Sequence, residues 1–312
     1  MGLEEDLAEL RALDLRADGS RDVLRRALRR KQGLIVAAAA DRVREAALDG
    51  FEDLLHQAFP VLCERPVKRD PGCRGKLAVV MALDAANVLD DEVFLQGVAL
   101  RQLEPAWGAP VDTAGPVRTH CLFALLRLHH PDVGGLVADQ LADPVPNVRI
   151  EAARAAASLG GSLGAALLRL KVRLGDDDSA ALGEALAGLC EADEDVGMRI
   201  AGEWLASSDE GTRELAALAL GQTRLDAAVP LLRRAAERAV RARERRTFWV
   251  ALGTLRLEGA RDVLLDQLDG PDVDVVLEAL APYRFDRRTL ILALDRAPRH
   301  LHDKVREALS MD

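Results

Sequence analysis

The chain has 312 residues and a formal net charge of −9; 49% of its residues are hydrophobic, and only 3% of all residues are aromatic. A core with so few aromatic side chains must be filled by Ala, Leu and Val, which suits closely packed helices better than a β-rich fold. The negative charge argues against a protein that coats nucleic acid by bulk electrostatics, because such a protein must neutralise many phosphates, although local patches could still bind anions.

No targeting or membrane segment is expected. The amino terminus lacks the basic start and apolar core of a signal peptide. The longest apolar run near it, residues 34–40, is far shorter than the roughly 20 residues that cross a bilayer. The four cysteines show no paired spacing, so neither disulfides nor a zinc ribbon is indicated. We therefore expect a cytoplasmic protein without a membrane partner.

Apolar residues recur three and four apart, interrupted at regular intervals by Gly, Pro or Asp, which predicts consecutive helix pairs. Proline at Pro71, Pro116, Pro146 and Pro271 marks helix starts, and Asp70, Asp178 and Asp209 are placed to cap helix starts. The nine predicted pairs are 3–15 with 20–31, 33–47 with 50–63, 71–87 with 90–103, 115–128 with 131–142, 147–159 with 163–174, 178–190 with 194–206, 209–221 with 226–240, 243–255 with 259–269, and 271–282 with 286–296.

The helix starts follow a fixed period. Pro116 and Pro271 are separated by five steps of 31 residues, and self-similarity at such a period indicates a stacked array of repeats. The expected fold is all-α, an α-solenoid formed by a superhelical stack of about nine antiparallel helix pairs. We treat 1–312 as one domain, with divergent repeats in 1–103, an inserted loop in 104–115, regular repeats in 116–296 and a C-terminal capping helix in 297–312.

The opening of one unit, Asp143-Pro144-Val145-Pro146-Asn147-Val148-Arg149 followed by an Ala-rich helix, resembles the HEAT repeat. The likeness is to the short bacterial type that also occurs in phycobilisome-lyase subunits, and weaker echoes lie at 115–118 and 209–213. The resemblance implies a surface that binds other proteins. It also implies that Asp and Arg pair between neighbouring repeats, as Asp143 could with Arg118 or Arg149.

The period is interrupted between Pro71 and Pro116, which lie 45 residues apart. The excess residues form a Pro/Gly-rich insert that carries Trp107, one of three tryptophans. Insertions in repeat arrays map to loops on one face, often the binding face. Trp107 is thus either an anchor for a partner or a ring that fills a gap between adjacent helix pairs.

Residues 65–76 hold five basic residues and one acid, Asp70, around a predicted helix start. Helix starts attract anions, so Arg69, Arg74 and Lys76 are candidates for binding an anionic ligand or an acidic partner segment. Cys73 lies beside Arg74 and could have a depressed thiol pKa, although a structural cysteine is the alternative.

Two charged runs lie further along the chain. Residues 233–261 are rich in arginine, whereas 176–195 contain eight acids and no basic residue. Trp204, Trp249 and Arg245 lie in or near these runs. They could imitate the basic, aromatic face of the HEAT-like-repeat alkylpurine DNA glycosylases, an alternative that the net charge opposes. A lyase or chaperone role, as in bilin attachment, is a further family-level alternative.

The sequence contains no recognisable catalytic motif. We therefore expect a non-catalytic scaffold or adaptor without cofactor or metal, which binds a protein partner and not nucleic acid. The expected surface is the concave face, formed by the second helices, with the 104–115 loop and the 65–76 helix start as further contacts. The candidate partner-binding residues are Trp107, Arg69, Arg74, Lys76, Trp204, Trp249 and Arg245.

Overall fold

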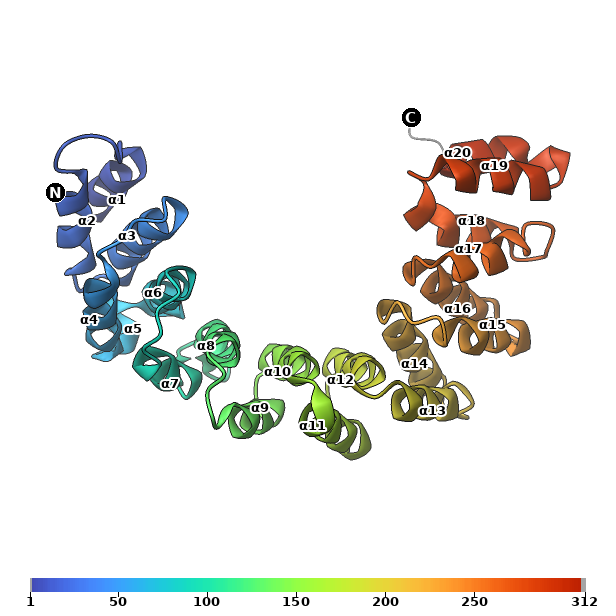
Figure 1. Ribbon diagram of the computed structural model, residues 1–312, viewed down its shortest axis with the longest axis horizontal. Coiled ribbons are helices and arrows are strands. Elements are labelled where there is room, and N and C mark those ends of the chain that lie inside the picture. The colour runs from blue at the N-terminus through green and yellow to red at the C-terminus, as the bar shows by residue number, and fades with distance from the viewer. Residues whose placement is uncertain (1, 310–312) are drawn as a thin grey trace. The chain divides into compact units, whose positions relative to one another are not determined.

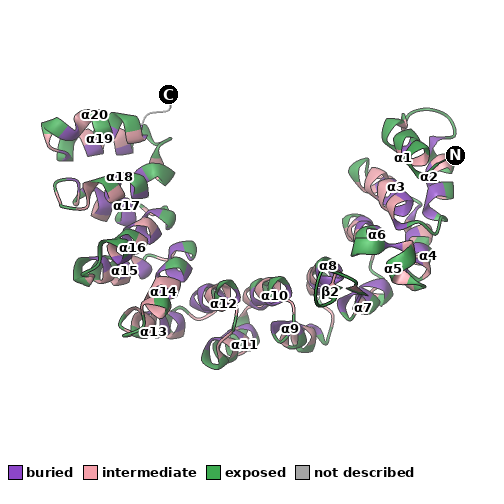
Figure 2. Ribbon diagram, turned by 180° about the vertical axis from the view of Figure 1, so that it is seen from behind, coloured by how far each residue is buried: buried purple, intermediate pink, exposed green. Residues whose placement is uncertain are grey.

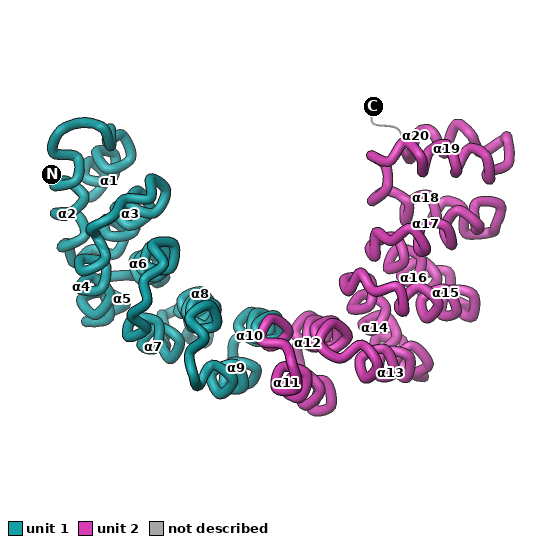
Figure 3. Tube along the Cα trace, in the orientation of Figure 1, with its two compact units in different colours: residues 1–155 teal, residues 156–312 magenta. Residues whose placement is uncertain are grey.

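The structure is a computed structural model that describes residues 2–309. Met1 and residues 310–312, the end of the expected capping segment, lie outside the described range. The described chain is an all-α solenoid, which confirms the expected fold class (Figure 1). It divides into two compact units, residues 1–155 and 156–312, where sequence analysis treated the chain as one domain (Figure 3). The division falls within helix α10, Pro146–Leu159.

The first unit contains nine complete α-helices and one small hairpin within its described residues. The helices are α1 (Leu3–Ala12), α2 (Ser20–Leu28), α3 (Gly33–Glu45), α4 (Glu52–Cys63), α5 (Pro66–Arg69), α6 (Arg74–Ala85), α7 (Glu92–Val98), α8 (Gly115–Arg127) and α9 (Val133–Leu141). The short 3-10 helix η1 spans Pro71–Cys73, and the two strands are β1 (Leu103–Glu104) and β2 (Val111–Asp112).

The second unit continues the pattern of helix pairs. Its helices are α11 (Gly161–Leu174), α12 (Ser179–Ala192), α13 (Glu194–Leu205), α14 (Glu210–Gln222), α15 (Ala228–Arg238), α16 (Ala242–Thr254), α17 (Glu258–Leu265), α18 (Val273–Leu280), α19 (Arg287–Arg296) and α20 (His302–Leu309), with 3-10 turns η2 (Ala281–Tyr283) and η3 (Arg299–Leu301). All nine predicted helix pairs are present, so the punctuation by Gly, Pro and Asp located them correctly.

Two of the four helix starts predicted at prolines differ: α18 begins at Val273, two residues after Pro271, and the start at Pro71 differs more. Pro71 opens only the 3-10 turn η1, and α6 begins at Arg74 because Gly72 and Cys73 adopt left-handed backbone angles (φ 72° and 56°). Asp70 nevertheless caps α6, since its carboxylate accepts the backbone N–H groups of Gly75 and Lys76 at 2.8 and 3.0 Å. The predicted caps Asp178 and Asp209 are also confirmed.

The first helices of successive pairs pack very closely. A Cβ atom on Gly75 would lie 2.8 Å from the carbonyl oxygen of Gly33, and one on Gly221 would lie 2.9 Å from that of Ala251. Buried residues gather between the two layers of helices (Figure 2). Within each unit taken separately, the first helices lie on the inner side of the curve (Figure 1). The expectation that second helices form the concave face is therefore wrong, because the small residues draw the first helices together.

Buried charged groups tie consecutive pairs in the first unit. The guanidinium of Arg118, which is fully buried, donates to the Leu100 carbonyl at 2.8 Å and to Asp143 at 3.1 Å. Arg149 donates to the backbone carbonyl of Asp143 at 2.9 Å. The expected pairing of Asp143 with Arg118 is confirmed, and its burial agrees with a structural role.

The second unit uses the same arrangement. Arg213 donates to the Ser207 carbonyl at 2.7 Å and forms an ion pair with Glu244. Arg245, 32 positions further on, donates to the Val240 carbonyl at 2.8 Å and pairs with Asp272 at 2.8 Å. Each arginine thus joins the end of the preceding helix to an acid of the following pair, and its guanidinium is occupied within the fold.

Candidate functional site

The insert between α7 and α8 forms an antiparallel hairpin. Leu103 lies opposite Asp112, and Glu104 lies opposite Val111. The connecting loop begins and ends with proline (Pro105 and Pro110), which restricts its backbone. Trp107 lies in this loop and is fully exposed, with a relative exposure of 108%. Its ring therefore fills no gap between helix pairs, and the packing alternative is wrong.

Asp112 anchors the hairpin at its base. Its carboxylate accepts the backbone N–H groups of Gln102 and Ala114 at 3.1 and 3.0 Å, and Arg118 donates to it at 2.8 Å. Burial alone raises the pKa of Asp112, but these donors outweigh it and hold the pKa below its ordinary value. The charged carboxylate is thus the form that the hairpin requires.

Glu104 ties the hairpin to the turn before α6. One of its carboxylate oxygens accepts hydrogen bonds from Thr113 Oγ1 at 2.7 Å, Gln102 Nε2 at 2.7 Å and the Gly72 backbone N–H at 2.6 Å. Burial raises the pKa of Glu104, yet these bonds lower it below its ordinary value overall. The same Gln102 amide also donates to the Asp70 carbonyl at 2.9 Å. The hairpin base is therefore held from both strands.

This hairpin presents apolar surface to solvent along its length. Besides Trp107, Leu103 and Val111 are 64% and 53% exposed. The strand pairing places Leu103 and Val111 on opposite sides of the ribbon. The hairpin therefore has a base that is fixed by hydrogen bonds and an exposed aromatic side chain in its connecting loop.

The basic helix start is used mainly within the fold. Lys76 is fully buried and pairs with the equally buried Asp70 at 2.9 Å, so the expectation that it contacts a ligand is corrected. Arg69 donates to the Val61 carbonyl at 2.6 Å and pairs with Glu64 at 2.7 Å. Arg74 is exposed to solvent. The neighbouring Cys73 is buried, and burial raises its pKa, which contradicts the depressed value considered from sequence.

The candidates in the second unit are also largely buried. Trp249 is 3% exposed, and its indole N–H donates to Asp272 at 3.3 Å. Arg245 pairs with the same carboxylate and donates to the Val240 carbonyl, so both side chains are engaged within the fold, and the expectation that they contact a partner is corrected. Trp204 is half-buried in α13. The exposed aromatic and basic pair that the glycosylase alternative required at Trp249 and Arg245 is absent.

The two charged runs are neutralised in part by neighbours. In the acidic run, Asp176 pairs with Lys171 at 2.6 Å, and Asp178 and Asp193 cap α12 and α13. Ion pairs in the arginine-rich run join Arg233 to Glu237, Arg241 to Glu210, Arg243 to Glu214, and Arg246 to Glu278. These ion pairs thus neutralise much of the arginine-rich run, whereas the acidic run, which holds eight acids and no basic residue, stays negative on balance.

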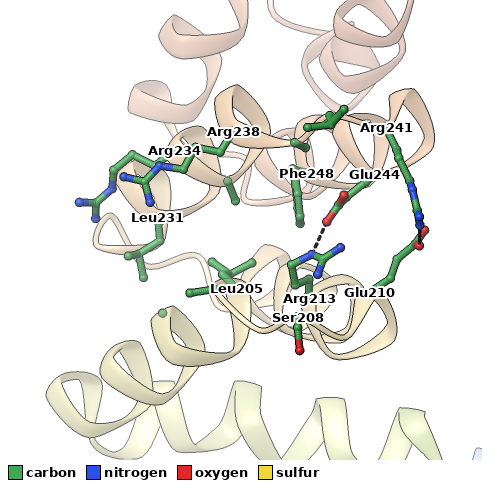
Figure 4. Close-up of a pocket in the computed structure, with 15 residues that line it drawn as sticks. Leu205, Ser208, Glu210, Arg213, Leu231, Arg234, Arg238, Arg241, Glu244 and Phe248 are labelled. Carbon is green, nitrogen blue, oxygen red and sulfur yellow. Dashed lines mark hydrogen bonds and ion pairs between the residues drawn. The ribbon is translucent and has the colours of Figure 1, made fainter.

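The second unit also contains a groove that no pattern in the sequence indicated. It has a volume of about 750 Å³ and lies between α13 and α15, where α14 and α16 begin (Figure 4). The residues that line it come from four helices, about 30 positions apart from pair to pair, so no local motif reveals it. Leu205, Leu231 and Val240 form its apolar surface above the buried Phe248, and arginines from α14 and α15 line it.

Neither a metal centre nor a membrane span is found in residues 2–309. These residues contain no group of three or more His, Cys, Asp and Glu side chains arranged to hold a metal ion. No helix among them combines the length and the apolar character that crossing a bilayer would take.

No protein-family model and no curated protein matches the chain. Among solved structures, the chain is similar to human deoxyhypusine hydroxylase in complex with glycerol, with 19% identity and a TM-score of 0.30 over 94% of this chain and 97% of that one. That neighbour is an enzyme, so the expectation of a non-catalytic protein is corrected and withdrawn. The low TM-score means that the likeness carries no argument about a reaction of this chain.

Proposed function

We propose that the chain is a HEAT-type adaptor that binds a protein partner, and that the hairpin 103–112 is a docking point with Trp107 as its anchor. The observation that carries this proposal is the full exposure of Trp107 on a hairpin whose base is fixed by Asp112 and Glu104. Aromatic anchors of this kind dominate the energy of many protein interfaces.

The energetics favour a role for Trp107 in binding over a role in stabilising the fold. The exposed indole contributes no burial to this fold, whereas its burial by a partner removes a large apolar surface from water. An anchor residue typically contributes about 2 kcal/mol or more to binding, which is roughly a 30-fold change in Kd. Because the hairpin base is already ordered, binding loses little additional conformational entropy.

The test compares partner capture by the wild-type chain and Trp107→Ala in extracts of the native host, with quantitative mass spectrometry. Leu89→Ala is the matched control, since Leu89 is also strongly exposed (83%) but lies in the turn between α6 and α7. We expect a partner that is recovered by wild type and Leu89→Ala and is lost with Trp107→Ala.

The melting temperature of each variant must be measured alongside, because an exposed side chain should be removable without loss of stability. Equal recovery of the same proteins by wild type and Trp107→Ala would contradict the proposal. A lowered melting temperature in Trp107→Ala would instead indicate a packing role.

A further inference from the structure

The groove of the second unit combines two arginines of α15 with an apolar surface. Arg234 and Arg238 lie on one side of the groove, and Leu205 and Leu231 lie nearby on α13 and α15 (Figure 4). Val240, which also lines the groove, is 89% exposed and adds to its apolar surface. The groove is independent of the hairpin, since all its residues belong to the second unit.

The charges in this groove are unequally paired. Arg213 is engaged by Glu244 and Arg241 by Glu210. Arg234 donates only to the carbonyl of Pro230 on its own helix at 3.0 Å, and no acidic partner of Arg238 is found in the described part of the chain. Two guanidinium groups, one turn of α15 apart, therefore remain available for an acidic ligand.

The two arginines lie beside an apolar surface, and this combination favours a peptide as the anionic ligand. Guanidinium groups bind carboxylates and phosphates alike through two parallel hydrogen bonds, so the acidic side chains of a peptide are among the groups that Arg234 and Arg238 can bind. Glu210 and Glu244 also line this groove, but they are already paired with Arg241 and Arg213 and so do not decide between one anion and another. The apolar surface of Leu205, Leu231 and Val240 needs a ligand that also carries an apolar side chain.

We infer that this groove binds a short acidic segment of a partner protein, in which Asp or Glu residues pair with Arg234 and Arg238 and one large apolar side chain packs against Leu205 and Leu231. Charge complementarity with the two unpaired arginines, together with the apolar surface beside them, determines this choice of ligand. Such an interaction weakens as ionic strength rises, because these arginines are exposed.

The probe is a library of random twelve-residue peptides displayed on phage and selected on the full chain at low ionic strength. The Arg234→Glu/Arg238→Glu variant serves for counter-selection. We expect enrichment of peptides in which Asp or Glu flanks Leu, Ile, Phe or Met. No enrichment, or enrichment of peptides without negative charge, would overturn the inference.

Fluorescence anisotropy with one enriched peptide then tests the residues. We expect Arg238→Glu to weaken binding at least tenfold, and Leu231→Ser to weaken it severalfold. Arg233→Glu is the matched control, because Arg233 lies on the same helix and is not among the groove residues, and we expect less than a twofold change. Equal weakening by Arg238→Glu and Arg233→Glu, or equal competition by duplex DNA, would refute the assignment. Trp107→Ala should leave the affinity unchanged, so this result is separable from the proposed docking at the hairpin.

Discussion

Replacing Lys76 by Met tests whether the buried pair with Asp70 is structural. The two charged groups lie 2.9 Å apart at 0% and 1% exposure. Breaking a buried ion pair by removing one partner costs about 3–5 kcal/mol, because the other charge stays buried without compensation. Asp70 keeps its two hydrogen bonds from the start of α6, so we expect a loss near the lower limit, about 3 kcal/mol.

The assay is urea unfolding followed by circular dichroism, combined with hydrogen exchange of the amides in α6. Hydrogen exchange is needed because a stack of repeats can unfold in parts and a single transition then misrepresents the local stability. The double variant Lys76→Met/Asp70→Asn removes both charges, and we expect it to regain only part of the lost stability, because the Asn side chain can accept just one of the two backbone N–H groups that Asp70 accepts.

Lys68→Met is the matched control, since Lys68 is exposed two positions before Asp70 and should change the free energy of unfolding by less than about 0.5 kcal/mol. If Lys76→Met cost less than about 1 kcal/mol, or no more than the control, the structural assignment of Lys76 would be refuted.

Three further predictions follow from packing and titration. Gly253→Val should destabilise the chain by about 1–3 kcal/mol in thermal or urea unfolding, because its Cβ would collide with the Ala279 backbone. Asp112 and Glu104 have lowered pKa values in the folded state, so their stabilisation is present above about pH 4 and is lost as the pH falls through the folded pKa values. The melting temperature should thus fall less steeply in Asp112→Asn between about pH 5 and 3 than in wild type; identical slopes would contradict this. Burial raises the pKa of Cys190 to about 12, so its thiol should resist iodoacetamide at pH 8 until the chain is unfolded, and rapid labelling of the native chain would contradict this.

The helix pairs could be predicted because residues near each helix start and end determine the boundaries locally. Proline at Pro146 and the glycines at Gly160 and Gly161 each act within one turn of the chain, and α10 and α11 begin and end near them. The start of α6 could not be located, since nothing in the residue types shows that Cys73 adopts a left-handed backbone.

The site was predictable only in part. The interrupted period pointed to the insert with Trp107, but charge and residue type alone could not separate exposed from buried side chains. Lys76 and Trp249 each have the character of a binding residue and are buried because helices distant in sequence cover them. The groove could not be foreseen because α13, α14, α15 and α16 supply its residues together.

The most direct measurement of the proposed docking point is photo-crosslinking in the native host, with benzoylphenylalanine in place of Trp107 and, separately, in place of Leu89. A discrete covalent adduct with one protein at position 107, absent at position 89, is the predicted result. No adduct at position 107, or the same adducts at both positions, would contradict the proposal that the hairpin receives a partner.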